Sequence, residues 1–480
     1  MFDVIVIGGG PAGVTAALRA RELGASVALV ERGRMGGTCT NDGCVPMRVL
    51  AKAARLVRDG EQLRNYGLIG ERPTVDFPRL LARTQALVDQ IHDKKRLEQH
   101  LERVGVTRFA GTARFVDDHT LVLDGGTTLQ GDKCIICAGG RARRLPFPGG
   151  ELALTHSDVW SLPKLPRSVA IVGGAATGCQ LASVFAAFGS KVSLLDLAPR
   201  ILPGEDELVS QVITDAFVRH KIEIISGIGG VERLERDGEG IHFHYTHHGE
   251  ERMLAVEAVI LAVGWPGNVD ALNLAAANVQ TERSYIVVDD HLRTSTPHIF
   301  AAGDITGRMM LVQSASFEAR IAAENAVHDG SLTFPHQIVP HGGFTDPEYG
   351  SVGLTEQQAR ANHDCCSVEV NYAELDRAVI DSRTEGVCKL IVSRTSHQIV
   401  GAHVVGEQAV EVVQLIAAGM AAGTRVEQLA QLELAYPTFT GIVGLAARQV
   451  VRDLGIVPLA PEWRSLEDPR AVEWERREQV

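Results

Sequence analysis

The sequence lacks three features that would place it in large classes of protein. It has 480 residues but no run of 18 apolar residues, so it predicts no transmembrane helix. It has no basic excess, since 47 Lys and Arg face 59 Asp and Glu, a net charge of −12, and non-specific binding to nucleic acid or an anionic membrane is not expected. The start, Met1 to Val6, is acidic where a signal peptide is basic, which predicts a cytoplasmic protein.

Cysteine is also too sparse for a disulfide framework, with eight in the chain. The composition, 45% apolar and 22% charged, excludes a disordered chain. At roughly 100–200 residues per domain, the length predicts about three domains. What needs an explanation is the position of particular Cys residues.

The first 31 residues have the pattern of a βαβ dinucleotide-binding unit. A short apolar strand over 2–7 leads into Gly8-Gly9-Gly10-Pro11-Ala12-Gly13, and a helix over 14–23 follows. A second apolar strand over 25–30 ends at Glu31. An ordinary strand–turn–helix is the alternative, but it does not require the trailing acid.

Each glycine of this pattern has a physical use, as does the acid that follows. Gly8 permits the tight turn, Gly10 allows the backbone to approach a pyrophosphate, and Gly13 allows the helix to pack on the strand. The start of the helix offers free N–H groups to phosphate. Glu31 can accept a hydrogen bond from a ribose hydroxyl.

The same pattern returns after residue 168. A strand over 168–172 precedes Gly173-Gly174-Ala175-Ala176-Thr177-Gly178, and Asp196 closes the next strand. A carboxylate there binds a 2′-hydroxyl and repels a 2′-phosphate, which favours NADH over NADPH, although Arg200 lies nearby. The alternative is a second fold unit without a ligand.

Two cysteines, Cys39 and Cys44, stand five residues apart. In a regular helix their Cα atoms would be roughly 8–9 Å apart, whereas a disulfide needs about 4.4–6.8 Å. If they pair, the helix must therefore be interrupted, and Asn41-Asp42-Gly43 supplies turn residues, with Pro46 suited to the first turn of a following helix. Two free thiols or a metal pair are the alternatives.

Taken together, the Gly8 cluster, the Cys39–Pro46 segment, Ala301-Ala302-Gly303-Asp304 and Phe344-Thr345-Asp346-Pro347 resemble the class I pyridine nucleotide–disulfide oxidoreductases. The resemblance implies an α/β fold with two Rossmann-like dinucleotide-binding domains and a C-terminal α+β dimerisation domain. It implies an FAD-binding domain over 1–150, an NAD(P)-binding domain over 151–270, a return to the FAD domain over 271–334, and a dimerisation domain over 335–480.

The same resemblance implies a homodimeric oxidoreductase with FAD and a nicotinamide, NADH rather than NADPH, and no resident metal. It makes Cys39–Cys44 a redox-active disulfide, with Cys44 as the thiolate against the flavin and Cys39 as the thiol that exchanges with substrate. A thiolate there should have a depressed pKa. The implied cofactor-binding residues are Gly8, Gly10, Pro11, Ala12, Gly13, Glu31, Arg32, Gly37, Thr38, Arg48, Ala113, Ala138, Gly139, Gly140, Gly173, Ala175, Gly178, Asp196, Gly264, Gly303 and Asp304.

One departure from the family concerns the electron acceptor. Relatives that act on disulfides carry His-Pro-Thr with a Glu soon after, but here Tyr436 replaces the His and Gly441 replaces the Glu. Tyr titrates near 10 and His near 6.5, so Tyr436 is a poor base at neutral pH. The chain therefore resembles most the mercuric-reductase-like branch, with Tyr436 as a catalytic residue and a thiophilic metal ion or other acceptor as substrate.

Three alternatives stay open. The chain could be a dihydrolipoyl dehydrogenase-like enzyme acting on a lipoyl carrier protein. It could be a flavin-bearing redox sensor or docking protein with slow turnover, since Gln180 and Ala176 replace a Glu and a Tyr of many relatives on the nicotinamide side. Finally, Tyr436 could simply fill volume at the dimer interface.

The remaining motifs have structural interpretations. Cys134, Cys137 and Cys179 are expected in the core, and the vicinal pair Cys365-Cys366 is expected to be structural. His242 and His244 should share one face of a strand in a solvated hairpin, where weak metal binding is an alternative. The last 20 residues, with Trp463 and Trp474, are expected to form a charged surface tail.

Overall fold

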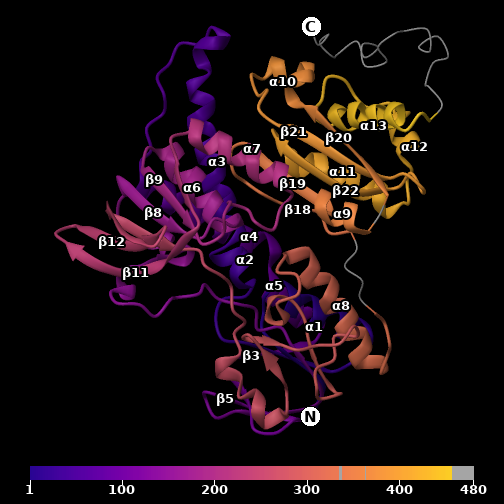
Figure 1. Cartoon of the computed structure of the whole chain (residues 1–480). Helices are drawn as coiled ribbons and strands as arrows, with labels where there is room; N and C mark the ends of the chain where they lie inside the picture. The colour runs from indigo at the N-terminus through magenta and orange to yellow at the C-terminus, as the bar shows by residue number, and fades with distance from the viewer. Residues whose placement is uncertain (334–337, 363, 457–480) are drawn as a thin grey trace.

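A computed structural model describes residues 1–333, 338–362 and 364–456 of the chain (Figure 1). It contains three main sheets, two of them parallel at their centres and one antiparallel. The predicted tail with Trp463 and Trp474 lies outside the described residues, as do residues 335–337 at the predicted start of the dimerisation domain. Within the described ranges, no helix is long and apolar enough to cross a membrane.

The first sheet has the strand order β3-β2-β1-β6-β5-β4, with β17 also paired to β6. Its strands are β1 (Phe2–Ile7), β2 (Val27–Glu31), β3 (Val106–Ala110), β4 (Ala113–Phe115), β5 (Thr120–Leu123), β6 (Thr128–Ile136) and β17 (Ile299–Ala301). Its central strands are parallel, and Val4, Val6 and Leu29 are almost fully buried. Burial on both faces explains why these strands are continuous apolar runs in the sequence.

Helices α1 (Pro11–Glu22) and α8 (Val312–His328) lie side by side against this sheet (Figure 1). Small residues, among them Ala16, Ala20 and Ala319, are buried between them and allow a close approach. Residues 299–328 thus return to the first sheet although they follow the second one in sequence, as the family resemblance implies.

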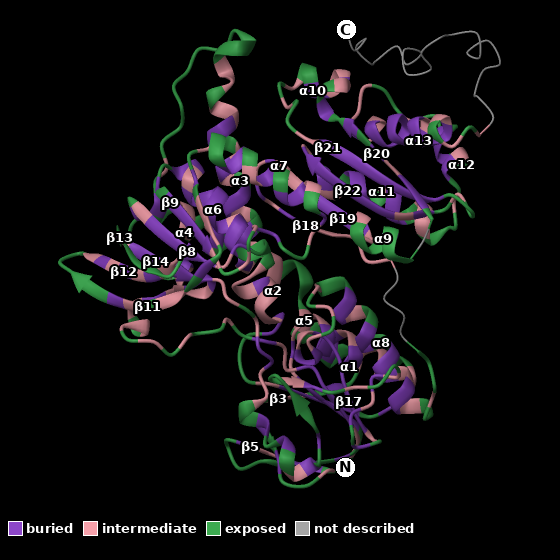
Figure 2. Ribbon diagram, viewed as in Figure 1, coloured by how far each residue is buried: buried purple, intermediate pink, exposed green. Residues whose placement is uncertain are grey.

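The second sheet has the order β10-β9-β8-β14-β7 and repeats the βαβ pattern. Its elements are β7 (Leu154–Thr155), β8 (Ser168–Val172), α6 (Ala176–Phe188), β9 (Lys191–Asp196), α7 (Glu207–Arg219), β10 (Glu223–Ser226) and β14 (Ala258–Leu261). A three-stranded antiparallel ribbon, β11 (Ile228–Asp237), β12 (Gly240–His247) and β13 (Glu250–Val256), extends from it with an exposed tip (Figure 2). His242 and His244 lie on β12, as predicted.

The third sheet is antiparallel, in the order β18-β19-β22-β21-β20. Its elements are β18 (His341–Gly343), β19 (Glu348–Gly353), α9 (Glu356–Asn362), β20 (Cys365–Asn371), α10 (Asp376–Ile380), β21 (Val387–Ser393), β22 (Ile399–Gly406), α11 (Ala409–Ala421), α12 (Val426–Ala430) and α13 (Gly441–Asp453). Helix α11 contacts β19 and β22, and α13 contacts β20 and β21. The predicted fold class, two Rossmann-like sheets and a C-terminal α+β domain, is confirmed.

Between β2 and β3 of the first sheet the chain forms two further helices, α4 (Phe77–Lys95) and α5 (Leu97–Arg103). The break is at Arg96, whose φ of 45° and ψ of 44° place it in the left-handed region, so the regular hydrogen-bond ladder ends there. Cys134, Cys137 and Cys179 are buried as predicted, and Cys365 and Cys366 are buried on β20.

Candidate active site

The first glycine turn has the close backbone packing that its sequence predicts. Gly8 has a φ of 108°, and a Cβ placed there would lie 2.2 Å from the Cys137 carbonyl oxygen. A Cβ at Gly13 would lie 1.7 Å from the Gly8 carbonyl oxygen. The N-cap of α1 is Gly10, which provides no side-chain cap, so the first-turn N–H groups remain available to an anion. This turn therefore fits a pyrophosphate.

Glu31 closes the same turn from the end of β2. Its carboxylate accepts hydrogen bonds from the Gly9 N–H at 2.5 Å and the Gly33 N–H at 2.7 Å. These bonds hold it beside the glycine turn, where a ribose would follow a bound pyrophosphate. Arg32 is exposed, and Ala113 is buried at the start of β4.

The wall opposite α1 comes from three distant segments. Gly303 has a φ of 81°, and a Cβ there would lie 3.2 Å from the Ala12 Cβ, so this segment passes directly over the start of α1. The Asp304 carboxylate accepts a hydrogen bond from Trp265 Nε1 at 3.1 Å. A Cβ at Gly140 would lie 2.4 Å from the same Nε1, which explains why glycine is needed there.

Ala138 and Gly139 are anchored to this wall as well. Asn268 Nδ2 donates to the Ala138 carbonyl at 2.8 Å, and the Asn268 N–H donates to the Gly139 carbonyl at 3.0 Å. The structure thus brings Gly8, Ala138, Gly303 and their neighbours together around one cradle. The residues present fit FAD.

The second glycine turn repeats the geometry of the first. Gly173 has a φ of 107°, a Cβ there would lie 2.3 Å from the Ala262 carbonyl oxygen, and a Cβ at Gly178 would lie 1.8 Å from the Gly173 carbonyl oxygen. Ala175 is the N-cap of α6 and again provides no side-chain cap. Asp196 accepts hydrogen bonds from the Gly174 N–H and, at 2.6 Å, from the Ala198 N–H.

Arg200 is already occupied by other groups near this turn. Its guanidinium donates to the carbonyl oxygens of Leu202, Pro203 and Glu205 at 2.8–3.1 Å. It therefore stabilises its own loop. Gly264 has a φ of 124° and lies beyond the end of β14, next to the second turn.

The two cysteines lie on either side of a break between helices. Helix α2 (Gly37–Asn41) carries Cys39, and α3 (Cys44–Glu61) begins at Cys44, with Pro46 in its first turn. Asp42 and Gly43 leave the helical conformation, and both of their N–H groups donate to the Thr38 carbonyl. The predicted interruption of the helix is confirmed.

Both cysteines are thiols in this structure, and they hydrogen-bond to each other. The hydrogen bond from Cys39 lowers the pKa of Cys44 to about 7, against the opposing effect of burial. The same bond, together with burial, raises the pKa of Cys39. The first proton of the pair is therefore lost more readily from Cys44 than from Cys39.

Asp304 links the thiols to the dinucleotide cradle. Its negative charge raises the pKa of both cysteines, which places it within electrostatic reach of them. Burial raises the pKa of Asp304 itself, partly offset by the hydrogen bond from Trp265. The thiols, Asp304 and the start of α1 thus surround one region of the molecule.

The loop between the cysteines is fixed by contacts that are not predictable locally. Trp160 Nε1 donates to the Asp42 carbonyl at 2.9 Å, and Ser157 Oγ donates to the Asp42 carboxylate at 2.6 Å. On the other side, His92 Nε2 lies 2.8 Å from Asn41 Oδ1. These contacts fix the loop between α2 and α3 in its non-helical conformation, which keeps the two sulfurs adjacent.

Tyr436 is placed in the C-terminal domain and is 56% exposed. Its hydroxyl donates to the Asp376 carboxylate, across a cleft that Arg377, Leu434 and Arg448 also line. Arg48, which the resemblance places near FAD, points toward the C-terminal domain, where it pairs with Glu348 at 2.9 Å and lies 4.1 Å from the Phe344 ring centre.

Several residues at the site were not predicted from the sequence, among them Trp265, Trp160 and Asp376. Trp265 directly follows Gly264, and only its contact with Asp304 reveals its position. The partners of Trp160 and Asp376 are 118 and 60 residues away in sequence, so no local spacing could have indicated them.

Known proteins resemble this chain over nearly its whole length. A family model described as pyridine nucleotide-disulphide oxidoreductase matches residues 2–319, and the dimerisation domain of the same family matches residues 339–447. The chain is 30% identical over 458 residues to a mercuric reductase of Staphylococcus aureus, covering 94% of this chain and 83% of that protein. It is 31% identical over 454 residues to a dihydrolipoyl dehydrogenase of Geobacillus stearothermophilus, covering 93% and 96%.

A solved structure supports the same relationship. The HOCl-induced flavoprotein disulfide reductase RclA from Escherichia coli has a TM-score of 0.84 and 27% sequence identity, covering 93% of this chain and 100% of that one. These relatives include both metal-ion and disulfide reductases, so they leave the acceptor open. The chain belongs to the pyridine nucleotide-disulphide oxidoreductase family and is a flavoprotein oxidoreductase with a dimerisation domain.

Proposed function

We propose that this enzyme passes electrons from NADH through FAD and the Cys39–Cys44 pair to a thiophilic metal ion or a similar acceptor. The observation that carries the proposal is the thiol pair itself. The two sulfurs share a hydrogen bond, Cys44 has a pKa of about 7, and both lie within electrostatic reach of Asp304. A structural pair of buried thiols would have no need for a depressed pKa.

FAD, held by Gly8, Gly13, Glu31, Gly303 and Asp304, would supply the two-electron carrier between NADH and the sulfurs. The first-turn N–H groups of α1 would bind its pyrophosphate, and Glu31 would accept a hydrogen bond from its ribose. Asn268 and Trp265 keep the opposite wall in position. The remaining expected residues, among them Arg32, Thr38 and Ala113, have no assigned contact in this proposal.

The protein residues also define the proton balance of the thiol step. When the dithiol delivers two electrons, the Cys39–Cys44 bond forms, the acceptor is reduced, and the two sulfur-bound protons leave. Above pH 7 most of the Cys44 thiol has already released its proton, so in that form only the Cys39 proton must depart during the step. Its departure is favoured by Lys95, whose charge lowers the pKa of Cys39.

A metal ion is the acceptor that the site favours. Thiolates are the ligands that soft metal ions prefer. Reduction of a metal ion needs side chains that coordinate the ion, and it does not need a base that exchanges protons with a substrate thiol. Tyr436 stands where disulfide-specific relatives carry a histidine base, and its partner Asp376 accepts its proton in a hydrogen bond. Support also comes from the mercuric reductase relatives and from a Cu(II) complex of RclA, 28% identical to this chain.

The nicotinamide and the oligomeric state follow from separate observations. Asp196 presents a carboxylate beside Gly174, and the guanidinium of Arg200 is bound to three carbonyls, so NADH is preferred to NADPH. The matched dimerisation domain supports a homodimer.

A dihydrolipoyl dehydrogenase-like activity on a lipoyl carrier protein is the second candidate. It is favoured by relatives of equal similarity, such as the enzyme of Geobacillus stearothermophilus at 31% identity. It is disfavoured by Tyr436, because a positioned general base contributes roughly 10²–10⁴-fold to the rate.

An acceptor panel separates the two candidates. We expect the holoenzyme at pH 7 to oxidise NADH with thiol-complexed Hg(II) or Cu(II), and to turn over lipoamide and glutathione disulfide slowly. A Tyr436→His variant should gain lipoamide activity, and Tyr436→Phe is the matched control that should not. Brisk lipoamide turnover by the unmodified enzyme would overturn the choice of a metal ion.

A Cys39→Ser variant tests the thiol relay in the same assay. It should retain FAD and lose acceptor reduction by about 10⁴-fold or more, the usual effect of removing a nucleophile. Unchanged turnover would show that the sulfurs do not carry the electrons.

A further inference from the structure

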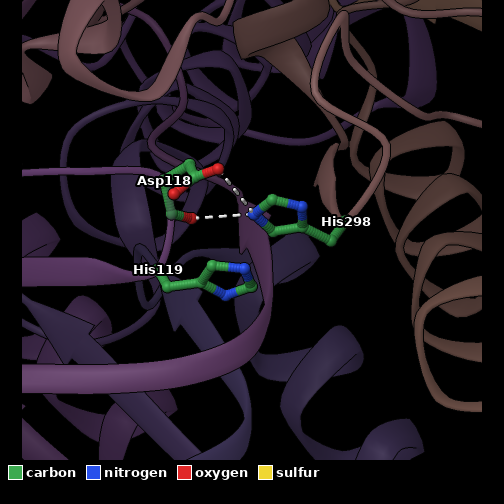
Figure 3. A group of neighbouring side chains, drawn as sticks. All are labelled: Asp118, His119 and His298. Carbon is green, nitrogen blue, oxygen red and sulfur yellow. Dashed lines mark hydrogen bonds and ion pairs between the residues drawn. The ribbon is translucent and has the colours of Figure 1, made fainter.

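A second group of metal-ligating side chains lies in the first sheet, outside the thiol site. Asp118 and His119 are in the turn between β4 and β5, and His298 directly precedes β17 (Figure 3). Each residue offers one ligand atom, and these atoms all lie within 4.8 Å of one another. Figure 1 shows β5 at the end of the molecule where the N-terminus lies, away from α2, which carries Cys39.

Strand β6 holds both histidines in place. The His119 carbonyl accepts from the Gly131 N–H at 3.1 Å, and the His298 carbonyl accepts from the Cys134 N–H at 3.1 Å. The Asp117 carboxylate accepts from the His119 N–H at 2.9 Å. Two segments 180 residues apart in sequence are therefore fixed against one strand before any ligand arrives.

The hydrogen bonds of His119 leave one ring nitrogen ready to bind. Its Nδ1 lies 2.9 Å from the Gly131 carbonyl, which can only accept, so Nδ1 carries the proton. The lone pair of the neutral ring is then on Nε2. A backbone carbonyl bonded to the other ring nitrogen is the usual arrangement of a metal-binding histidine.

His298 faces two oxygens of Asp118. Its Nε2 lies 3.0 Å from the Asp118 carbonyl and 3.8 Å from the carboxylate (Figure 3). Its ring is stacked on that of His119, with centres 4.0 Å apart and planes at 3°. Two imidazoles and a carboxylate thus meet at one place, with a carbonyl oxygen beside them.

We propose that Asp118, His119 and His298 bind a divalent transition-metal ion of the zinc, nickel and copper group. This donor set suits ions of intermediate softness. Zinc–ligand bonds of about 2.0–2.1 Å put neighbouring ligand atoms roughly 3.4 Å apart, so the three groups must move closer together. A metal ion lies in the plane of the imidazole that binds it, so the His119 ring must turn out of its stack on His298, and His298 Nε2 must give up the N–H that it donates to the Asp118 carbonyl. His119 is exposed and can turn without disturbing the core. The ion would clamp the β4–β5 turn to the segment before β17.

The half-buried histidines of β12 offer a matched comparison. His242 and His244 lie on one face of a strand, but His244 pairs with Glu251 at 2.8 Å and with Glu235, and His242 pairs with Asp237. One nitrogen of each ring is thus occupied by a different carboxylate. They share the residue types of the proposed site without its convergence.

Zn(II) titration of the full-length holoprotein tests the proposal. The protein is treated with chelator and kept oxidised without NADH, so that Cys39 and Cys44 are joined and do not compete. We expect calorimetry to show one tight site per chain and thermal unfolding to shift upward with Zn(II). His298→Gln and His119→Gln should each weaken binding by at least about tenfold and abolish the thermal shift.

The His242→Gln/His244→Gln double variant is the control, and it should bind Zn(II) unchanged. His119→Gln alters an exposed side chain, so it remains informative if His298→Gln does not fold. Any of three results would overturn the proposal. These are full binding by His119→Gln, loss of binding in the β12 control, and no saturable binding at one ion per chain. The test does not depend on the electron acceptor.

Discussion

The two dinucleotide-binding turns of this protein are built alike but are followed by different chain segments. Gly8 and Gly173 have φ angles of 108° and 107°, and a Cβ at Gly13 or Gly178 would lie 1.7 or 1.8 Å from a carbonyl oxygen. Each turn has one acidic residue, Glu31 or Asp196, that accepts from a glycine N–H. The geometry of the glycine turns therefore does not distinguish the first dinucleotide-binding site from the second.

The difference lies in what comes after each second strand. After β2 the chain reaches Gly37, whose Cβ would lie 2.8 Å from the Gly10 Cα, and continues directly into Cys39 and Cys44. After β9 the chain forms a loop that Arg200 holds through three carbonyls. The first turn is thus followed directly by the two cysteines, and the second by a loop that Arg200 holds.

The largest effect should come from substitutions that disrupt each glycine turn separately. Gly13→Ala places a methyl group against the Gly8 carbonyl, and we expect FAD to be lost during purification. Gly178→Ala makes the matching clash in the second turn, so FAD should stay while kcat/KM for NADH falls by about 100-fold, since a 1 Å misplacement has that effect.

Flavin content and steady-state kinetics measure these outcomes. Gly204→Ala is the control, because a Cβ there would have no atom within 4 Å. Loss of FAD from Gly178→Ala, with normal FAD in Gly13→Ala, would reverse our assignment of the two cofactors.

A smaller change should sharpen the contrast between the two carboxylates. Asp196→Asn removes the charge that repels a 2′-phosphate, and we expect the preference for NADH over NADPH to drop by about tenfold, or about 1.4 kcal/mol. The ratio of kcat/KM values for the two nucleotides measures it. An unmodified enzyme that prefers NADPH would contradict the role given to Asp196.

The smallest expected effect concerns the thiols that follow the first cradle. The pKa of Cys44 is about 7 because Cys39 donates to it, so the thiolate is present above pH 7 and is lost as the pH falls below that value. Cys39→Ala removes the donor, which should raise the pKa of Cys44 and slow its alkylation at pH 7 by several-fold. Rates of iodoacetamide labelling between pH 5 and 9 measure the shift, and an unchanged midpoint would exclude the hydrogen bond as its cause.

Much of this arrangement could be predicted because it is local. The apolar strands β1 and β8, the glycine turns and the break after Asn41 follow from residue types within short windows. The break at Arg96 was not predicted, since no glycine or proline marks it. Contacts such as Trp265 with Asp304 join segments 39 residues apart and depend on how the sheets meet, which local patterns do not encode.

The central claim is that Cys39 and Cys44 carry electrons between the flavin and an outside acceptor. One equivalent of NADH per chain, added anaerobically to the oxidised holoprotein and followed by alkylation and mass spectrometry, tests it directly. We predict that both cysteines become labelled while the visible flavin spectrum remains that of the oxidised cofactor. A bleached flavin with Cys39 and Cys44 still protected as a disulfide would contradict the account.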